Sequence, residues 1–82
     1  MEQFESNKNG FRVVLAPIFE LLVFKKGKLN ELDWLAFVAR TEQSIKENPH
    51  QFLGKELPHK SVVDRAVEEI FIEFMEEERV EA

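Results

Sequence analysis

Residues 11–24 read FRVVLAPIFELLVF, and this stretch decides the fold. Its polar side chains are Arg12 and Glu20, and Pro17 is its one backbone breaker. However the segment is wound, apolar side chains face nearly every direction, which is typical of an element covered on all sides rather than of a surface helix. A membrane span needs about twenty uninterrupted apolar residues, so we expect a core element or an interface instead.

Pro17 divides the stretch, because proline has no donor for a helical hydrogen bond and disfavours the α conformation in the residue before it. Proline does fit the first turn of a helix, and Gly27 after two lysines is typical of a helix end. We therefore expect a helix at residues 17–26 after an extended or loosely helical lead at 11–16. One kinked helix from Phe11 is an alternative, and a strand at 11–16, in an α+β fold, is another.

Two further helices are indicated by capping residues and apolar periodicity. Asn30 is a good N-cap for a helix that Asn48-Pro49 would end. Ser61 opens a third helix whose apolar residues recur three and four positions apart, and these form one arc: Val63, Ala66, Val67, Ile70, Phe71 and Phe74. The sequence thus predicts an all-α fold, a compact bundle of three main helices at about 17–26, 30–47 and 61–78, with a looped connection at 48–60.

The two ends of the chain are expected to be less ordered than its middle. We expect one helical domain at 1–82, since 82 residues is the size of a single small domain. Residues 1–10 are mostly polar and end in the turn-prone Asn-Lys-Asn-Gly, which predicts a mobile N-terminal arm. Glutamates crowd the end of the third helix, where the helix dipole disfavours them, so 79–82 are expected to form a frayed acidic tail.

Composition disfavours several classes of partner. The formal net charge is −5, and a field of this sign repels phosphate backbones and anionic lipid. Nucleic acid is therefore disfavoured as a partner, and a membrane is not expected. The chain has no cysteine, and no apolar signal segment follows Met1, which indicates a cytoplasmic protein.

The sequence contains no recognisable catalytic pattern. Its three glycines are isolated, which excludes a glycine-rich phosphate loop. His50 and His59 are the two histidines, and their spacing matches no metal motif. We expect a non-enzymatic protein with no catalytic residues, no cofactor, no metal site and no small-molecule substrate.

The sequence carries more apolar surface than three helices of this length can cover among themselves. The first helix is apolar nearly all round, the front half of the second is too, and the third has apolar residues outside its main arc. A symmetric pair of chains would cover the surplus with one self-complementary patch. The sequence thus predicts a protein–protein interaction module, a small regulator or adaptor that acts through helix packing as a homodimer. Its interface candidates are Glu20, Trp34, Phe37, Phe71, Ile72 and Met75.

Two other functions fit parts of the sequence. An acidic, phage-type inhibitor would imitate nucleic-acid charge and block a nucleic-acid-binding protein, with Glu68, Glu69, Glu73, Glu76, Glu77 and Glu78 as its charge-mimic candidates. A helix-turn-helix-like DNA-binding regulator would use the basic residues Lys25, Lys26, Lys28, Arg40 and Lys46. Against the second, no helix carries the Arg, Lys, Asn and Gln cluster needed to read base edges.

Overall fold

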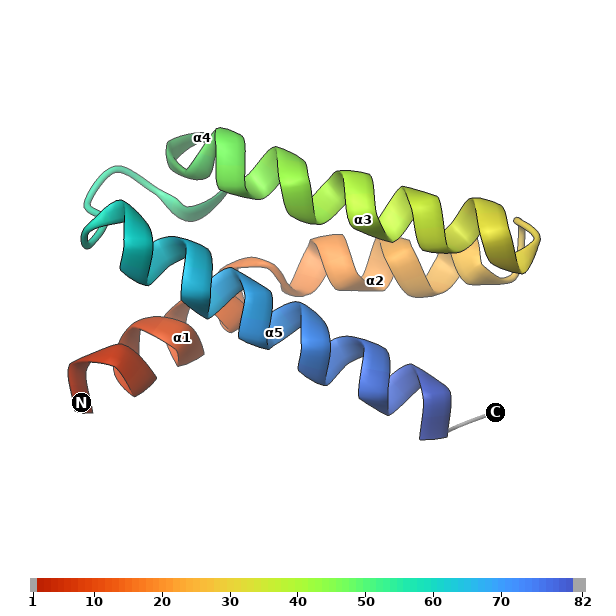
Figure 1. Cartoon of the computed structure of the whole chain (residues 1–82), viewed down its shortest axis with the longest axis horizontal. Helices are drawn as coiled ribbons and strands as arrows, with labels where there is room; N and C mark the ends of the chain where they lie inside the picture. Colours follow the sequence, from red (N-terminus) through yellow and green to blue (C-terminus); the bar gives the residue numbers. More distant parts are fainter. Residues whose placement is uncertain (1, 81–82) are drawn as a thin grey trace.

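The computed structural model describes the backbone of residues 2–80 and the side chains of residues 4–78. It contains five helices: α1 (Glu2–Val14), α2 (Ala16–Lys26), α3 (Glu31–Glu47), α4 (Pro49–Leu53) and α5 (Lys60–Val80). The described residues include no strand, so the all-α prediction is confirmed. Figure 1 shows α2 and α3 running antiparallel beside each other, while α5 runs obliquely to both and diverges from them toward its C-terminal end. The short α1 packs against α5.

The prediction that Pro17 begins a helix or marks a kink is confirmed. Pro17 lies in the first turn of α2, and Leu15 separates α2 from the end of α1. The backbone N–H of Leu15 still donates to the carbonyl of Phe11 at 2.8 Å, so the break is confined to a single residue. The strand predicted as an alternative at 11–16 is wrong, because residues 11–14 are the last turn of α1 and Ala16 begins α2.

Helix α1 occupies most of the segment predicted to be an irregular arm. Phe4, Lys8, Phe11 and Leu15 recur four, three and four positions apart, which places them on one side of a helix. Phe11 and Leu15 are buried in the core, and Phe4 packs against it. Residues 2–10 are therefore helical rather than irregular, while their mobility in solution stays a prediction.

Helices α2, α3 and α5 match the three predicted helices within a residue or two, but the predicted count is too low. Asn30 caps α3 as expected, because its Oδ1 accepts a hydrogen bond from the backbone N–H of Asp33 at 2.9 Å. The connection at 48–60 is only partly a loop, because Pro49 begins the short helix α4.

Helix α5 provides more core residues than any other helix. The six residues of its predicted apolar arc are all buried, with at most 8 % of their surface exposed. Phe19 of α2 packs on this arc, with its ring centroid 5.0 Å from that of Phe71 and 4.8 Å from that of Phe74. These ring contacts pack α2 against α5. Residues 79–82, predicted to be a frayed tail, lie outside the residues whose side chains are described.

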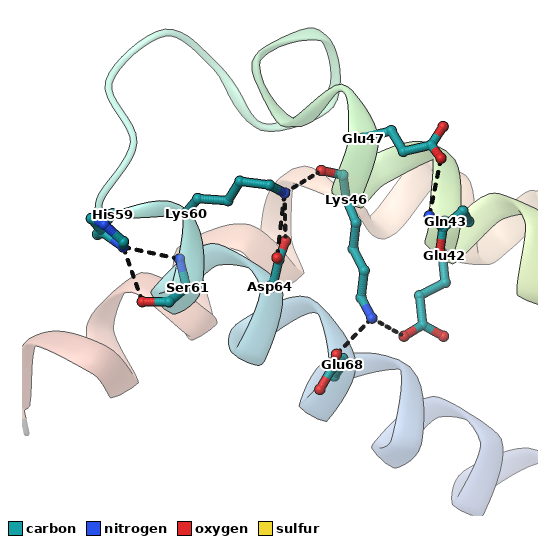
Figure 2. Close-up of polar contacts among 9 residues, drawn as sticks. All are labelled: Glu42, Gln43, Lys46, Glu47, His59, Lys60, Ser61, Asp64 and Glu68. Carbon is teal, nitrogen blue, oxygen red and sulfur yellow. Dashed lines mark hydrogen bonds and ion pairs between the residues drawn. The ribbon is translucent and has the colours of Figure 1, made fainter.

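A polar network joins the end of α3 to the beginning of α5 (Figure 2). Lys46 of α3 pairs with Glu68 of α5 at 2.7 Å and with Glu42 of its own helix at 3.3 Å. Burial is the largest effect on the Lys46 pKa and lowers it, but hydrogen bonds to Glu68 and Glu42 together raise the pKa above its ordinary value. Lys60 donates to the carbonyl of Lys46 and pairs with Asp64. These bonds hold the two helix ends together beside the loop that connects them.

Candidate functional site

The large apolar side chains that remain exposed are concentrated in one part of the chain. Nine such side chains are at least 37 % exposed among the described residues. Ile72 of α5 is one of them, and the other eight fall between residues 13 and 35, on α2 and its two flanks: Val13, Val14, Leu21, Val23, Phe24, Leu29, Leu32 and Leu35. Residues 11–24 are predicted to be a core element or an interface; in the single chain the core covers only part of them, and an interface over the rest stays a prediction.

Helix α2 buries one side and leaves the opposite side open. Leu22 is fully buried, and its carbonyl accepts a hydrogen bond from Nε1 of Trp34 at 2.7 Å. At about 100° per residue, Leu21 lies about 100° and Phe24 about 160° around the helix from Leu22. Both are exposed, Leu21 by 47 % and Phe24 by 59 %. We call the open side the α2 surface; it comprises Glu20, Leu21, Val23, Phe24 and Lys28.

The centre of the α2 surface is a row of three residues, Glu20, Phe24 and Lys28, each four positions from the next. Residues at this spacing form a ridge along a helix. The helical turn continues past the end of α2, since the backbone N–H of Leu29 donates to the carbonyl of Lys25 at 3.0 Å. Lys28 consequently lies over Phe24, with its Nζ atom 5.1 Å from the ring centroid. The ridge thus has an acid at one end, an aromatic ring in the middle and a base at the other end.

Two grooves lie between α5 and the ends of the other helices. The first has a volume of about 500 Å³ and is floored by Trp34, Leu35 and Met75. Lys26 and Glu78 close one side of it with an ion pair of 3.1 Å, and the Lys26 Nζ atom lies 5.4 Å from the Trp34 ring centroid. This groove is apolar inside and charged at its rim.

The second groove, of about 460 Å³, borders the α2 surface. Glu20 and Val23 form its edge, and Phe19 and Phe74 lie in its lining. Its position means that a chain docked on the α2 surface would also reach this groove.

The predicted interface residues do not form one surface. Phe71 and Trp34 have 2 % and 4 % of their surface exposed, so the core of the single chain already uses them. Phe37 is half-buried and packs against the same core. Phe71 and Trp34 are therefore corrected from partner-facing to core-facing residues, while a place for Phe37 at an interface stays a prediction.

The other three predicted interface residues are accessible, but Glu20 lies on α2 whereas Ile72 and Met75 lie three positions apart on α5. Glu20 is exposed on α2, Met75 lines the first groove, and Ile72 is 57 % exposed on α5. Glu20 is predicted from the sequence to form an ion pair, with Arg12 or Arg40 as candidates, or to lie at an interface. No ion pair of Glu20 is formed among the described residues, and its place at an interface stays a prediction. Helical spacing places Glu20 on the outward side of α2, which explains its exposure.

The charge cluster between α1 and α5 is the main feature that sequence reasoning missed. Lys8 is buried, with 7 % of its surface exposed, and its Nζ atom lies 2.8 Å from Glu73 and 3.4 Å from Glu69. Arg12 also pairs with Glu73. The hydrogen bond to Glu73 is the main cause that raises the pKa of Lys8, and the same bond lowers the pKa of Glu73. The signal in the sequence was a lysine within an otherwise apolar helical stripe.

The charge-mimic candidates are largely engaged within the chain. Glu68 pairs with Lys46, Glu69 with Lys8 and Arg65, Glu73 with Lys8 and Arg12, and Glu78 with Lys26. Glu76 and Glu77 are exposed on α5. Four of the six carboxylates thus already have a cation beside them, which weakens the field that a mimic of phosphate spacing would present.

Other kinds of site find little support in the part of the chain that the structure describes. No group of three or more histidine, aspartate or glutamate side chains is arranged to hold a metal ion there. None of the described helices is both long and apolar enough to cross a bilayer. Comparison with protein-family models, with curated proteins and with solved structures found no match for this chain. The fold and its exposed apolar surface define the chain as a small all-α protein.

Proposed function

We propose that this chain is a non-enzymatic protein–protein interaction module, a small regulator or adaptor that acts through helix packing. The observation that carries the proposal is the concentration of eight exposed large apolar side chains between residues 13 and 35. About half of each of these side chains is open to water, which corresponds to apolar area on the order of 500 Å². Three of the eight, Leu21, Val23 and Phe24, lie together on the α2 surface, and exposed apolar patches on a monomer are often functional.

The form of the surface favours a protein partner over a small ligand. Helix α2 is convex, so Leu21 and Phe24 project outward rather than line a pocket. A convex apolar ridge is covered most readily by the groove of another helical protein. Phe24 would be the central anchor, because aromatic residues in the middle of an interface dominate binding energy.

The test is affinity capture from an extract of the native host, with the immobilised parent chain beside Phe24→Glu and Ile72→Glu. Ile72→Glu is the matched control for Phe24→Glu, because Ile72 and Phe24 are 57 % and 59 % exposed but lie on different helices. We expect at least one protein, either a different chain or another copy of this one, to bind the parent and Ile72→Glu. Binding to Phe24→Glu should fall at least about tenfold, the effect of losing a central aromatic anchor.

The salt dependence of capture separates this proposal from charge mimicry. Binding through apolar packing should survive about 0.5 M salt, whereas binding between opposite charges should be lost as they are screened. Equal capture of the same proteins by the parent, Phe24→Glu and Ile72→Glu would contradict the helix-packing function. So would capture that is lost at about 0.5 M salt and is also lost when Glu76 and Glu77 are both replaced by glutamine.

A further inference from the structure

We infer that the occupant of the α2 surface is a second copy of this chain, packed antiparallel through the ridge of Glu20, Phe24 and Lys28. The inference rests on the proposed function and adds to it the identity of the partner and the residues that face each other. In this arrangement a two-fold axis passes beside Phe24, so that the two Phe24 rings meet. Glu20 of each chain then faces Lys28 of the other.

The order of charges along the ridge is self-complementary. From the start of α2 the ridge runs acid, aromatic, base, and a second copy turned end for end presents base, aromatic, acid. Antiparallel pairing therefore places Glu20 of each chain beside Lys28 of the other, so a symmetric dimer contains this ion pair twice. Parallel pairing would instead place Glu20 beside Glu20 and Lys28 beside Lys28, which is repulsive.

The side chains beside the ridge supply the apolar contact. Leu21 flanks it on one side and Val23 on the other, and they are 47 % and 46 % exposed. Residues four apart on two antiparallel helices interlock as ridges and grooves, with a crossing angle of about −50°. The ridge would therefore lie in the groove between these neighbours on the second copy.

The α2 surface provides part of the area that a stable pair needs. A standard interface buries about 800 Å² from each partner, of which slightly more than half is apolar. The exposed side chains of Leu21, Val23 and Phe24, with the aliphatic stem of Lys28, contribute to this apolar share. The second groove, which borders Glu20 and Val23, supplies a further place for side chains of the other copy.

The first test is sedimentation equilibrium of the full chain from about 1 to 100 µM, a range suited to interfaces of modest size. We expect the parent and Ile72→Glu to form dimers and Phe24→Glu to stay monomeric. Circular dichroism shows whether each variant keeps its helices, and Leu21→Glu serves as a second variant if Phe24→Glu loses them. A monomeric parent across this range, or a dimer abolished by Ile72→Glu and kept by Phe24→Glu, would overturn the inference.

The second test is a charge exchange across the proposed pair. Glu20→Lys and Lys28→Glu should each weaken the dimer by about tenfold or more, because each places like charges together twice. The double variant, which keeps the net charge of the parent, should associate as the parent does. A one-to-one mixture of the two single variants should form a heterodimer tighter than either homodimer. If neither the double variant nor the mixture recovers association, the antiparallel pairing of Glu20 with Lys28 is wrong.

The two proposals can fail separately. A monomeric parent that still captures a different protein through Phe24 would refute self-association and leave the interaction module standing. Loss of both self-association and Phe24-dependent capture would refute both.

Discussion

Lys8 is a charged residue that is buried against the core and is paired there with carboxylates. It occupies a position on α1 between Phe4 and Phe11, where an apolar residue would be ordinary. A buried ammonium group needs both charge and hydrogen bonds around it, and Glu73 and Glu69 of α5 provide them. The pair thereby fixes the register of α1 against α5, because a shift of one turn would separate the charges.

At the residue scale we predict that Glu73→Gln changes the pH dependence of stability. The hydrogen bond from Lys8 is the main cause that lowers the pKa of Glu73 below its ordinary value of 4.5. A group with a lowered folded-state pKa stabilises the fold fully above its unfolded pKa, and this contribution is lost as pH falls through the folded pKa. Lys8, whose own pKa is raised, stays charged throughout this range. Glu73→Gln should therefore lower the melting temperature by about 5 °C at pH 7.

Thermal unfolding followed by circular dichroism between pH 7 and pH 2 measures this effect. The parent and Glu73→Gln curves should converge as the pH falls below 4.5. Glu77→Gln is the control, since Glu77 is exposed and its replacement should leave the melting temperature almost unchanged. Parent and Glu73→Gln curves that stay parallel over the whole range would show that the bond with Lys8 does not stabilise the fold.

At the scale of the element, Gly10 tests whether α1 is a stable helix. It lies inside α1 with a helical φ, and a Cβ atom added there meets no atom within 4 Å. Glycine in a helix interior costs about 0.5–1 kcal/mol relative to alanine. Gly10→Ala should therefore raise the free energy of unfolding by this amount, measured by urea denaturation.

Gly54→Ala is the matched control for that measurement. Gly54 follows α4 with φ at +111°, a conformation that alanine adopts only with strain. Gly54→Ala should destabilise the fold by about 1 kcal/mol or more. If Gly10→Ala has no effect while Gly54→Ala does, residues 2–10 behave as the mobile arm that the sequence predicts.

The elements that could be predicted from the sequence are those whose apolar spacing is regular. The arc of α5 follows helical spacing without interruption, so both its extent and its buried residues are correct. Helix α1 could not be predicted in this way, because Lys8 interrupts its stripe and residues 7–10 favour a turn. Its helical form depends on the carboxylates of α5, which lie more than sixty residues away in the chain.

At the scale of the whole molecule, the prediction of surplus apolar surface is consistent with the fold, but not every residue named for it is exposed. Sequence reasoning placed the surplus on all three predicted helices, including the one at 17–26, and named Trp34, Phe71 and Ile72 among the interface residues. Trp34 and Phe71 instead fill the core, and most of the exposed apolar side chains lie on α2 and its flanks. Periodicity alone could not locate them, because a helix that is apolar on all sides gives no indication of which side its neighbours cover.

The arrangement of the helices explains why α2 stays half open. Helix α3 runs beside it (Figure 1), and α5 contacts it through Phe71 and Phe74, which pack on Phe19, so each covers one part of its circumference. Helix α1 packs on α5 and does not extend over the outer side of α2. The part of the chain that the structure describes has no further helix over this side.

A protein that completes its core by self-association has a stability that depends on its concentration. The free energy of unfolding of a domain this small is on the order of 5–10 kcal/mol, and binding of a second folded copy adds up to about 2.7 kcal/mol when its concentration exceeds the dissociation constant a hundredfold. We therefore predict that the melting temperature of the parent rises by about 5–10 °C between 1 and 100 µM chain. Differential scanning calorimetry and circular dichroism in cells of different path length measure this rise. Ile72→Glu should show the same rise, and Phe24→Glu should melt at one temperature throughout. A parent whose melting temperature is independent of concentration would show that the α2 surface stays open to water in the folded chain when no other protein is present.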